Sequence, residues 1–196
     1  MYTFARIVVG TIYRVMFRFR IAGKENIPKD GGVILCANHR SYHDTLVLGL
    51  ASPRDLHFLA KYELFKSKFL SKLFTSLGAI PINRENPGVD SLKKAVSILK
   101  EGRALAMFIQ GGRRKEINNE DAKAGVALFA IKSKVPVVPV NIASKFKLFS
   151  KVNINIGKPI TFEEFWDKKV RAAELNLVAQ RVMDAISGLG NEAAPV

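Results

Sequence analysis

The fold is decided by residues 33–44, which read Val33-Ile34-Leu35-Cys36-Ala37-Asn38-His39-Arg40-Ser41-Tyr42-His43-Asp44. The apolar residues at the start of this stretch have the unbroken hydrophobic character of a strand that is buried on both faces, as in a parallel sheet. The apolar run 45–50 behind it can continue as a buried helix. The polar and charged residues between them therefore lie at a strand end, which is where open α/β sheets place their ligands.

Strands and helices alternate along the rest of the chain. We expect strands at 17–21, 33–37, 56–60, 78–84, 104–109, 135–142 and 152–156. We expect helices at 45–50, 90–100, 122–132 and 171–189, a broken helix at 61–77 and a loop at 159–166. This order predicts a single-domain α/β sandwich with a largely parallel or mixed central sheet.

Residues 1–20 predict an amphipathic helix. Arg6, Gly10, Arg14 and Arg18 recur every four residues and make a narrow basic stripe, while apolar residues cover the rest of the circumference. Arginines interrupt the segment before the ~20 apolar residues that a membrane-spanning helix needs. A core helix with a solvated edge and a helix lying in the membrane interface both fit this pattern. The charge of the chain favours the membrane, because a basic residue near an anionic surface contributes about 1 kcal/mol.

The composition limits the class of protein. The 196 residues are 48% hydrophobic, which is enough for one well-cored domain, and they carry a formal net charge of +14. This charge implies an anionic partner, and the absence of a recognition helix, zinc-ligand spacing or an RNA-binding aromatic motif argues against nucleic acid. The single cysteine, Cys36, excludes an internal disulfide, and no leader peptide opens the sequence. We therefore expect the chain in the cytoplasm or at the cytoplasmic face of the membrane, as a peripheral or monotopic protein.

Four ordered blocks resemble the glycerophospholipid acyltransferases, most closely the bacterial 1-acyl-sn-glycerol-3-phosphate acyltransferases. The blocks are Asn38-His39 with Asp44, then Gly78-Ala79-Ile80-Pro81-Ile82-Asn83-Arg84, then Phe108-Ile109-Gln110-Gly111-Gly112-Arg113, then Val135-Pro136-Val137-Val138-Pro139-Val140. The resemblance runs from about Phe17 to Pro159. It implies an acyltransferase domain over residues 21–196, behind a membrane-associating segment over residues 1–20.

The resemblance implies transfer of an acyl group from acyl-CoA or acyl carrier protein to the sn-2 hydroxyl of lysophosphatidic acid. The product would be phosphatidic acid, made at an anionic membrane surface without a cofactor or metal. His39 suits the role of general base, because the unperturbed imidazole pKa lies near operating pH. Asp44 would fix the tautomer of that ring and stabilise the imidazolium, so no protein nucleophile is needed. A different lysophospholipid acceptor and a non-catalytic protein that binds anionic membranes are the alternatives.

Other side chains near this pair are weaker candidates for a catalytic role. His43 is adjacent to Asp44, but neighbouring side chains point apart in a helix or strand, so His43 is the second candidate for the base. Ser41 lacks the nucleophile elbow of an acyl carrier, and we expect its hydroxyl to cap the following helix. His57, in an apolar strand, and Cys36, in the buried strand, are expected to be structural.

The phosphate of the acceptor requires cations. In the resembled family the positions of Arg84 and Arg113 bind the glycerol phosphate, and an arginine fork can hold two phosphate oxygens at once. Gly111 and Gly112 allow backbone N–H groups to approach closely, and Lys61 is a third candidate cation. Solvated surface charges are the alternative interpretation of each cation.

The chain departs from the resembled family in two blocks. The third block usually reads Phe-Pro-Glu-Gly-Thr-Arg, and this chain has Ile109, Gln110 and Gly112 in place of the proline, glutamate and threonine. The second block usually has aspartate before its arginine, where this chain has Asn83. Both acid-to-amide changes remove a negative charge near the expected phosphate, and we hypothesise that they strengthen the positive field there or change the preferred head group. A weakened or altered enzyme is the alternative interpretation. Residues 135–140 predict a strand and a wall of the acyl-chain path.

Overall fold

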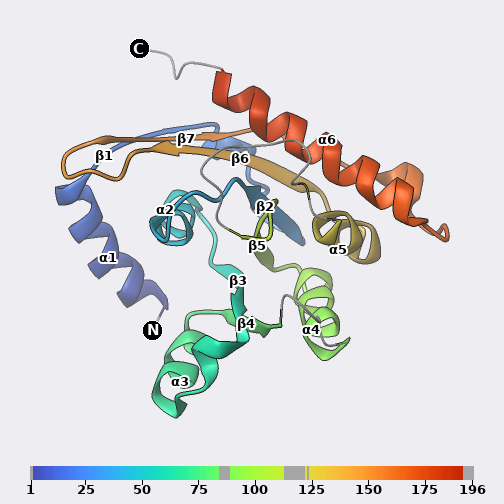
Figure 1. The fold of residues 1–196 in the computed structure, drawn as a ribbon, viewed down its shortest axis with the longest axis horizontal. Helices are drawn as coiled ribbons and strands as arrows, with labels where there is room; N and C mark the ends of the chain where they lie inside the picture. Colours follow the sequence, from blue (N-terminus) through green and yellow to red (C-terminus); the bar gives the residue numbers. More distant parts are fainter. Residues whose placement is uncertain (1, 84–88, 113–121, 123, 192–196) are drawn as a thin grey trace.

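A computed structural model describes residues 2–83, 89–112, 122 and 124–191 (Figure 1). Within these residues, strands form one seven-stranded sheet. The strands are β1 (Arg18–Ala22), β2 (Val33–Ala37), β3 (Leu56–Lys61), β4 (Ala79–Ile82), β5 (Ala104–Phe108), β6 (Val137–Ser144) and β7 (Lys151–Ile156). Their order across the sheet is β1-β7-β6-β2-β5-β3-β4.

Helices cover both faces of this sheet (Figure 1). The helices are α1 (Tyr2–Met16), α2 (His43–Ala51), α3 (Lys68–Ser76), α4 (Val89–Lys100), α5 (Gly125–Ser133) and α6 (Ala172–Asn191). The described residues also contain the short 3-10 turns η1 (Lys24–Asn26), η2 (Tyr62–Phe65) and η4 (Glu163–Phe165). Helices α1 and α2 pack on one face and α4, α5 and α6 on the other, which confirms the predicted α/β sandwich.

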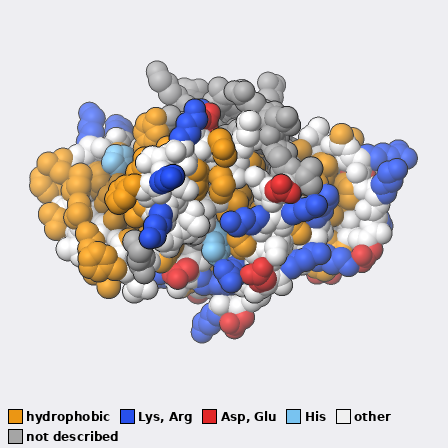
Figure 2. Space-filling view, turned by 90° about the horizontal axis from the view of Figure 1, so that it is seen from below, with side chains coloured by type: hydrophobic (Ala, Val, Ile, Leu, Met, Phe, Trp, Pro, Cys, Tyr) orange, Lys and Arg blue, Asp and Glu red, His pale blue; other side chains and the backbone are white. Residues whose placement is uncertain are grey.

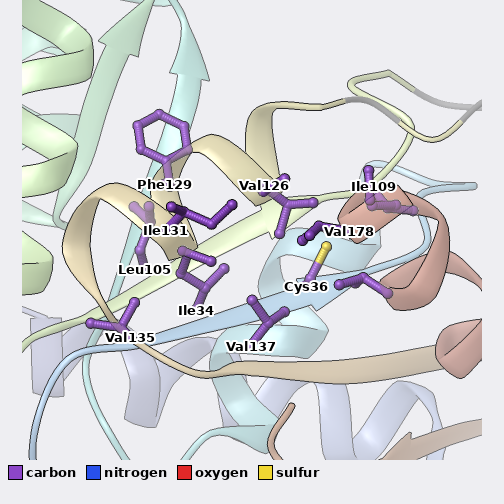
Figure 3. Packing of buried hydrophobic residues seen from close by; sticks show 14 of the residues in the cluster. Ile34, Cys36, Leu105, Ile109, Val126, Phe129, Ile131, Val135, Val137 and Val178 are labelled. Atoms are coloured by element: carbon purple, nitrogen blue, oxygen red, sulfur yellow. The ribbon is translucent and has the colours of Figure 1, made fainter. Parts of the chain in front are cut away.

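Strand β2 shows why the run 33–37 is apolar throughout. All five of its residues are fully buried. Ile34 and Cys36 pack into the core that includes Val126 of α5 and Val178 of α6 (Figure 3). The alternate residues of β2 pack into the opposite core, against α1 and α2. A strand between two helical layers therefore needs an apolar side chain at every position.

Most of the sheet is parallel, as predicted. Strand β2 pairs in parallel with both β5 and β6, and β3 pairs in parallel with β5 and β4. Strand β1 pairs in parallel with β7, and only the β6–β7 pairing is antiparallel among the described strands. Because the carboxyl ends of parallel strands meet at one edge, the segments that follow β2, β5, β3 and β4 come together there.

The element boundaries differ from the predictions mainly at helix ends. Strand β2 has the predicted bounds, and the other strands agree within a few residues. Helix α2 begins at His43, two residues before the predicted start, and α5 begins at Gly125, three residues after it. The predicted broken helix over 61–77 consists of η2 followed by α3, and the predicted loop at 159–166 contains η4.

Helix α1 forms as predicted, but its buried side is not its most apolar one. Gly10 and Tyr13 are its buried residues, and a Cβ at Gly10 would lie 3.2 Å from the Leu50 side chain of α2, so glycine permits close helix packing there. The exposed apolar side chains of α1 are Phe4, Ile7, Val8, Ile12 and Val15. Much of the apolar surface of α1 is therefore exposed, whereas an ordinary core helix would bury it in the core.

One arginine of the predicted basic stripe points inward. The Arg6 guanidinium donates a hydrogen bond of 2.5 Å to the carbonyl oxygen of Ser52, the C-cap residue directly after α2. A cation at this position satisfies a carbonyl at a helix C-terminus. No helix in the described part of the chain combines the length and apolar character needed to cross a bilayer.

Candidate active site

A pocket of about 1080 Å³ opens at the carboxyl ends of the parallel strands. Its walls are mostly apolar side chains from α1, α2, α3, α5 and the central strands. Five of the predicted site residues line it, namely His39, Lys61, Gln110, Gly111 and Gly112. The fold thus brings together blocks that lie far apart in the sequence, and a hydrogen bond joins His39 to Gln110, 71 residues away.

His39 and Asp44 form a buried hydrogen-bonded pair. His39 Nδ1 lies 3.0 Å from Asp44 Oδ2, and the two residues are 8% and 1% exposed. A carboxylate can only accept a hydrogen bond, so Nδ1 carries the ring proton and donates a hydrogen bond to Asp44. The other ring nitrogen, Nε2, then keeps the lone pair that a general base uses.

Asp44 also shapes the loop that carries His39. Its Oδ2 accepts hydrogen bonds of 2.7 Å from the backbone N–H groups of Arg40 and Ser41, in addition to the bond from His39. Asp44 lies in the first turn of α2. One carboxylate oxygen therefore fixes the loop, the helix start and the imidazole together.

Two buried amide side chains connect this loop to neighbouring strands, and no local sequence pattern indicates either contact. The Asn38 amide donates to Ile142 O (2.9 Å) and accepts from Ile142 N (2.7 Å), which extends the pairing of β2 with β6 through a side chain. Gln110 Oε1 accepts a hydrogen bond of 3.3 Å from His39 N. The glutamine that replaces the usual glutamate thus holds the histidine loop against the end of β5.

Phe108 makes a contact with His39 that sequence reasoning missed. Its ring stacks on the His39 imidazole, with centroids 3.9 Å apart and planes inclined by 13°. The register of β2 with β5 pairs Ala37 with Phe108, which places this ring beside the loop that follows β2. An aromatic face both limits the rotation of the imidazole and attracts the imidazolium cation.

We predict that Phe108→Leu lowers kcat by about 3- to 30-fold, because a cation over an aromatic face gains about 0.7–2 kcal/mol. The KM for the acceptor alcohol that the resemblance implies should change less than kcat, since the lost interaction is with the imidazolium that a general base forms. Steady-state kinetics of Phe108→Leu beside Phe108→Tyr measure this effect. Equal losses in the two variants would contradict stacking, because tyrosine retains the aromatic face.

The alternative residues near the pair have other partners. His43 Nδ1 lies 2.6 Å from the Tyr13 hydroxyl of α1, and its ring stacks on Phe146. Ser41 Oγ accepts a hydrogen bond of 3.3 Å from His43 N, at the start of α2, as a capping hydroxyl does. His57 Nδ1 lies 3.2 Å from Gly78 O, and burial lowers the pKa of this imidazole.

The candidate phosphate-binding residues are only partly described. Lys61, at the end of β3, forms an ion pair of 3.0 Å with Glu63, and both side chains are exposed. Gly111 has a φ of 65°, a left-handed conformation that favours glycine. Asn83, after β4, is exposed. Arg84 and Arg113 lie outside the described residues.

The prediction that residues 135–140 form a wall of the acyl-chain path is wrong. Strand β6 begins at Val137, but none of these residues lines the pocket, because Val137, Val138 and Val140 are buried in the two cores.

Among the described residues, no three His, Cys, Asp or Glu side chains are grouped as a metal site requires. Cys36 is fully buried, and burial raises the pKa of its thiol.

Comparison with known proteins gives consistent matches. The model of a family described as Acyltransferase matches residues 18–143. The 1-acyl-sn-glycerol-3-phosphate acyltransferase of Bacillus subtilis is 31% identical, over 94% of this chain and 96% of its own. The protein of the same name from Streptococcus pneumoniae is also 31% identical, over 97% of this chain and 74% of its own.

A solved structure has a similar fold. The crystal structure of the 1-acyl-sn-glycerophosphate acyltransferase PlsC from Thermotoga maritima matches with a TM-score of 0.73. The alignment covers 99% of this chain and 81% of that one, at 22% sequence identity. The α/β fold of this chain is thus shared with that protein.

Proposed function

The chain belongs to the acyltransferase family, and we propose that it transfers an acyl group from a thioester donor to the sn-2 hydroxyl of 1-acyl-sn-glycerol-3-phosphate. The names of the relatives support this acceptor. The observation that carries the chemistry is the buried His39–Asp44 pair at the wall of a large apolar pocket. The donor is acyl-CoA or acyl carrier protein, and the product is phosphatidic acid.

His39 acts as the general base in this proposal. Its Nε2 takes the proton of the sn-2 hydroxyl while the hydroxyl oxygen attacks the thioester carbonyl. The imidazolium that forms is stabilised by Asp44, which accepts the hydrogen bond from Nδ1. The tetrahedral intermediate then collapses to the new ester and expels the thiolate, which recovers the proton from His39. The acyl group passes directly to the acceptor without a bond to the protein.

The pocket suits an amphiphilic substrate. Its apolar walls, which include Phe58, Leu59, Leu77 and Phe129, can bury an acyl chain. Its polar side, at the ends of β5 and β3, carries Gln110, the glycine pair 111–112 and Lys61. We assign the glycerol phosphate to this polar side, with Arg84 and Arg113 as its expected cations.

The direct test is an assay of the purified chain with lysophosphatidic acid and either acyl-CoA or acyl carrier protein as donor. Formation of phosphatidic acid with at least one donor supports the proposal, and the ratio of the two rates identifies the donor. A chain that acylates only other lysophospholipids would make the acceptor assignment wrong. Vesicle binding without any acyl transfer would favour the non-catalytic membrane-binding alternative.

The acceptor preference should depend on Gln110. Gln110→Glu keeps an acceptor for His39 N but adds a negative charge at the proposed phosphate site. At an effective dielectric of 20, the repulsion between two unit charges stays above about 1.4 kcal/mol out to roughly 12 Å. We therefore expect kcat/KM for lysophosphatidic acid to fall about tenfold relative to zwitterionic lysophosphatidylcholine. Gln180→Glu on α6 is the matched control, and an unchanged ratio in Gln110→Glu would refute the charge hypothesis.

Peripheral attachment to the membrane is part of the proposal. Helix α1 exposes Phe4 and Val15 by 73% and 69%, and a helix in water rarely turns so many apolar side chains outward. Arg14 and Arg18 are exposed at its C-terminal end. An anionic bilayer, at the cytoplasmic face by our assignment, satisfies both kinds of side chain.

A further inference from the structure

Helix α3 and the turn η2 before it form an unusual surface segment. Neither element contributes a buried residue. Large apolar side chains are instead exposed, and Phe69 is the most exposed of them at 77%. The others are Tyr62, Leu64 and Leu70. A helix with no buried side chain gains little from the core, so its apolar side chains suit an environment other than water.

Lysines accompany these apolar side chains. Lys66, Lys68 and Lys72 are exposed on α3 and just before it, and they line a shallow hollow of about 550 Å³. The only acidic residue in 61–77 is Glu63, and it is paired with Lys61. The segment therefore presents positive charge and apolar surface together.

The loop between β6 and β7 has the same composition. Residues 145–149 read Lys-Phe-Lys-Leu-Phe, and Leu148 and Phe149 are 62% and 59% exposed. The loop is fixed against α1, because Phe149 N donates a hydrogen bond of 2.7 Å to Met16 O. Its exposed apolar side chains are thus held beside the end of the helix that we assign to the membrane.

These two segments lie at opposite ends of α1. In Figure 1 the β6–β7 loop lies at the C-terminal end of α1, and α3 lies near its N-terminal end. The view from below shows hydrophobic side chains gathered over α1 and basic side chains interspersed with hydrophobic ones over α3 (Figure 2). The pocket extends between the two helices, since Tyr2 and Arg6 of α1 and Phe74 of α3 all line it.

We propose that α3 with η2 and the loop 145–149 are lipid-contacting elements that extend α1 into one docking face for an anionic bilayer. The inference rests on the proposed membrane attachment of α1. Apolar side chains enter the interface and the lysines meet the anionic head groups, as in other proteins that lie on a bilayer. A protein partner would have to match basic and apolar segments spread along the whole of α1, whereas a bilayer contacts all of them at once.

Docking of this face on a bilayer brings the pocket next to the lipid phase that contains the proposed lysolipid substrate. Because α1 and α3 both touch the bilayer and both line the pocket, a lysolipid can pass from the lipid phase to His39 without leaving an apolar environment. The free energy of exposing its acyl chain to water, about 0.8 kcal/mol per CH₂ group, is then avoided.

The test measures binding of the full chain to two kinds of vesicle, phosphatidylcholine alone and phosphatidylcholine with phosphatidylglycerol. We predict that the double variant Lys68→Gln and Lys72→Gln binds the anionic vesicles about 25-fold more weakly, since two lysines each contribute about 1 kcal/mol. Phe69→Ser and Leu148→Ser should weaken binding to both kinds of vesicle. None of these residues lines the pocket that contains His39, so activity on monomeric short-chain lysophosphatidic acid should remain.

Matched controls lie on the other side of the molecule. Lys132→Gln on α5 and Leu177→Ser on α6 change exposed residues of the same type and should bind like the wild type. Wild-type binding by the α3 and loop variants would overturn the inference and leave the acyltransferase proposal intact. Loss of activity with acyl carrier protein alone, at unchanged vesicle binding, would instead make the α3 lysines a docking site for that acidic donor. An active wild type that binds no vesicles would refute membrane attachment as a whole.

Discussion

Replacing His39 by alanine is expected to lower kcat by about 10³- to 10⁴-fold while the chain stays folded. The imidazole is the group that moves the proton in the proposed reaction, and general base catalysis contributes about 10²–10⁴-fold. The positioning of both substrates in the pocket remains, so a small residual rate is expected. The stability effect should be smaller than that of replacing Asp44, because the ring loses its hydrogen bond to Asp44 and its stacking on Phe108 while the bonds of Asp44 to the loop backbone remain.

The measurement is single-turnover acyl transfer to lysophosphatidic acid, with thermal unfolding as the check on folding. His57→Ala is the matched control, because His57 also bonds through Nδ1 but to a backbone carbonyl. We expect it to retain activity within a few-fold. If His43→Ala were inactive and His39→Ala active, the base would be the histidine that contacts Tyr13.

Replacing Asp44 by asparagine should lower kcat almost as much, by about 10³- to 10⁴-fold. An amide at this position can donate to Nδ1, which moves the ring proton to Nε2 and removes the lone pair that accepts the substrate proton. The amide nitrogen that donates to Nδ1 then lies where Oδ2 was and faces the backbone N–H groups of Arg40 and Ser41, so this variant should lose more stability than His39→Ala. A loss of about 2 kcal/mol corresponds to a fall in Tm of roughly 4–8 °C.

The two effects of Asp44 can be separated. Ser41→Ala removes a hydroxyl from the same loop without touching the carboxylate, and we expect nearly full activity and a small fall in Tm. Asp44→Glu keeps the charge on a longer side chain, and it should restore part of the stability but little of the activity. Full activity in Asp44→Asn would show that the amide oxygen takes the place of Oδ2 and that the carboxylate charge does not limit the reaction.

The elements were predictable where local chemistry decides them. The predicted bounds of strand β2 agree with the structure at both ends, because both faces of the strand are buried and each of its five positions therefore needs an apolar side chain. The start of α2 was placed too late, because it depends on Asp44 accepting bonds from residues 40 and 41 rather than on an apolar pattern. The environment of α1 was ambiguous, since an amphipathic pattern does not say what covers its apolar side.

The pairing of His39 with Asp44 was predicted from the resemblance, and their contact distance agrees with it. The stacking of Phe108 on His39 was missed, because it follows from the register of β2 with β5 and from nothing local. The role of Gln110 as an acceptor for His39 N was missed as well, because a sequence shows the loss of a charge but not the bond that the new amide makes. The contact of His43 with Tyr13 joins residues 30 positions apart, in two helices whose packing no periodicity fixes.

The pairing of β1 with β7 has a consequence for how the chain is made. Residues 18–22 pair only with residues of β7 among the described strands, so this strand leaves the ribosome without a partner until residues 151–156 have followed. At a synthesis rate of about 5–20 residues per second, that strand and the exposed apolar helix before it stay unpaired for roughly 7–27 seconds. Pairing of β1 with β7 is therefore a late, long-range step, and the unpaired strand and the exposed apolar side chains of α1 favour aggregation during this interval.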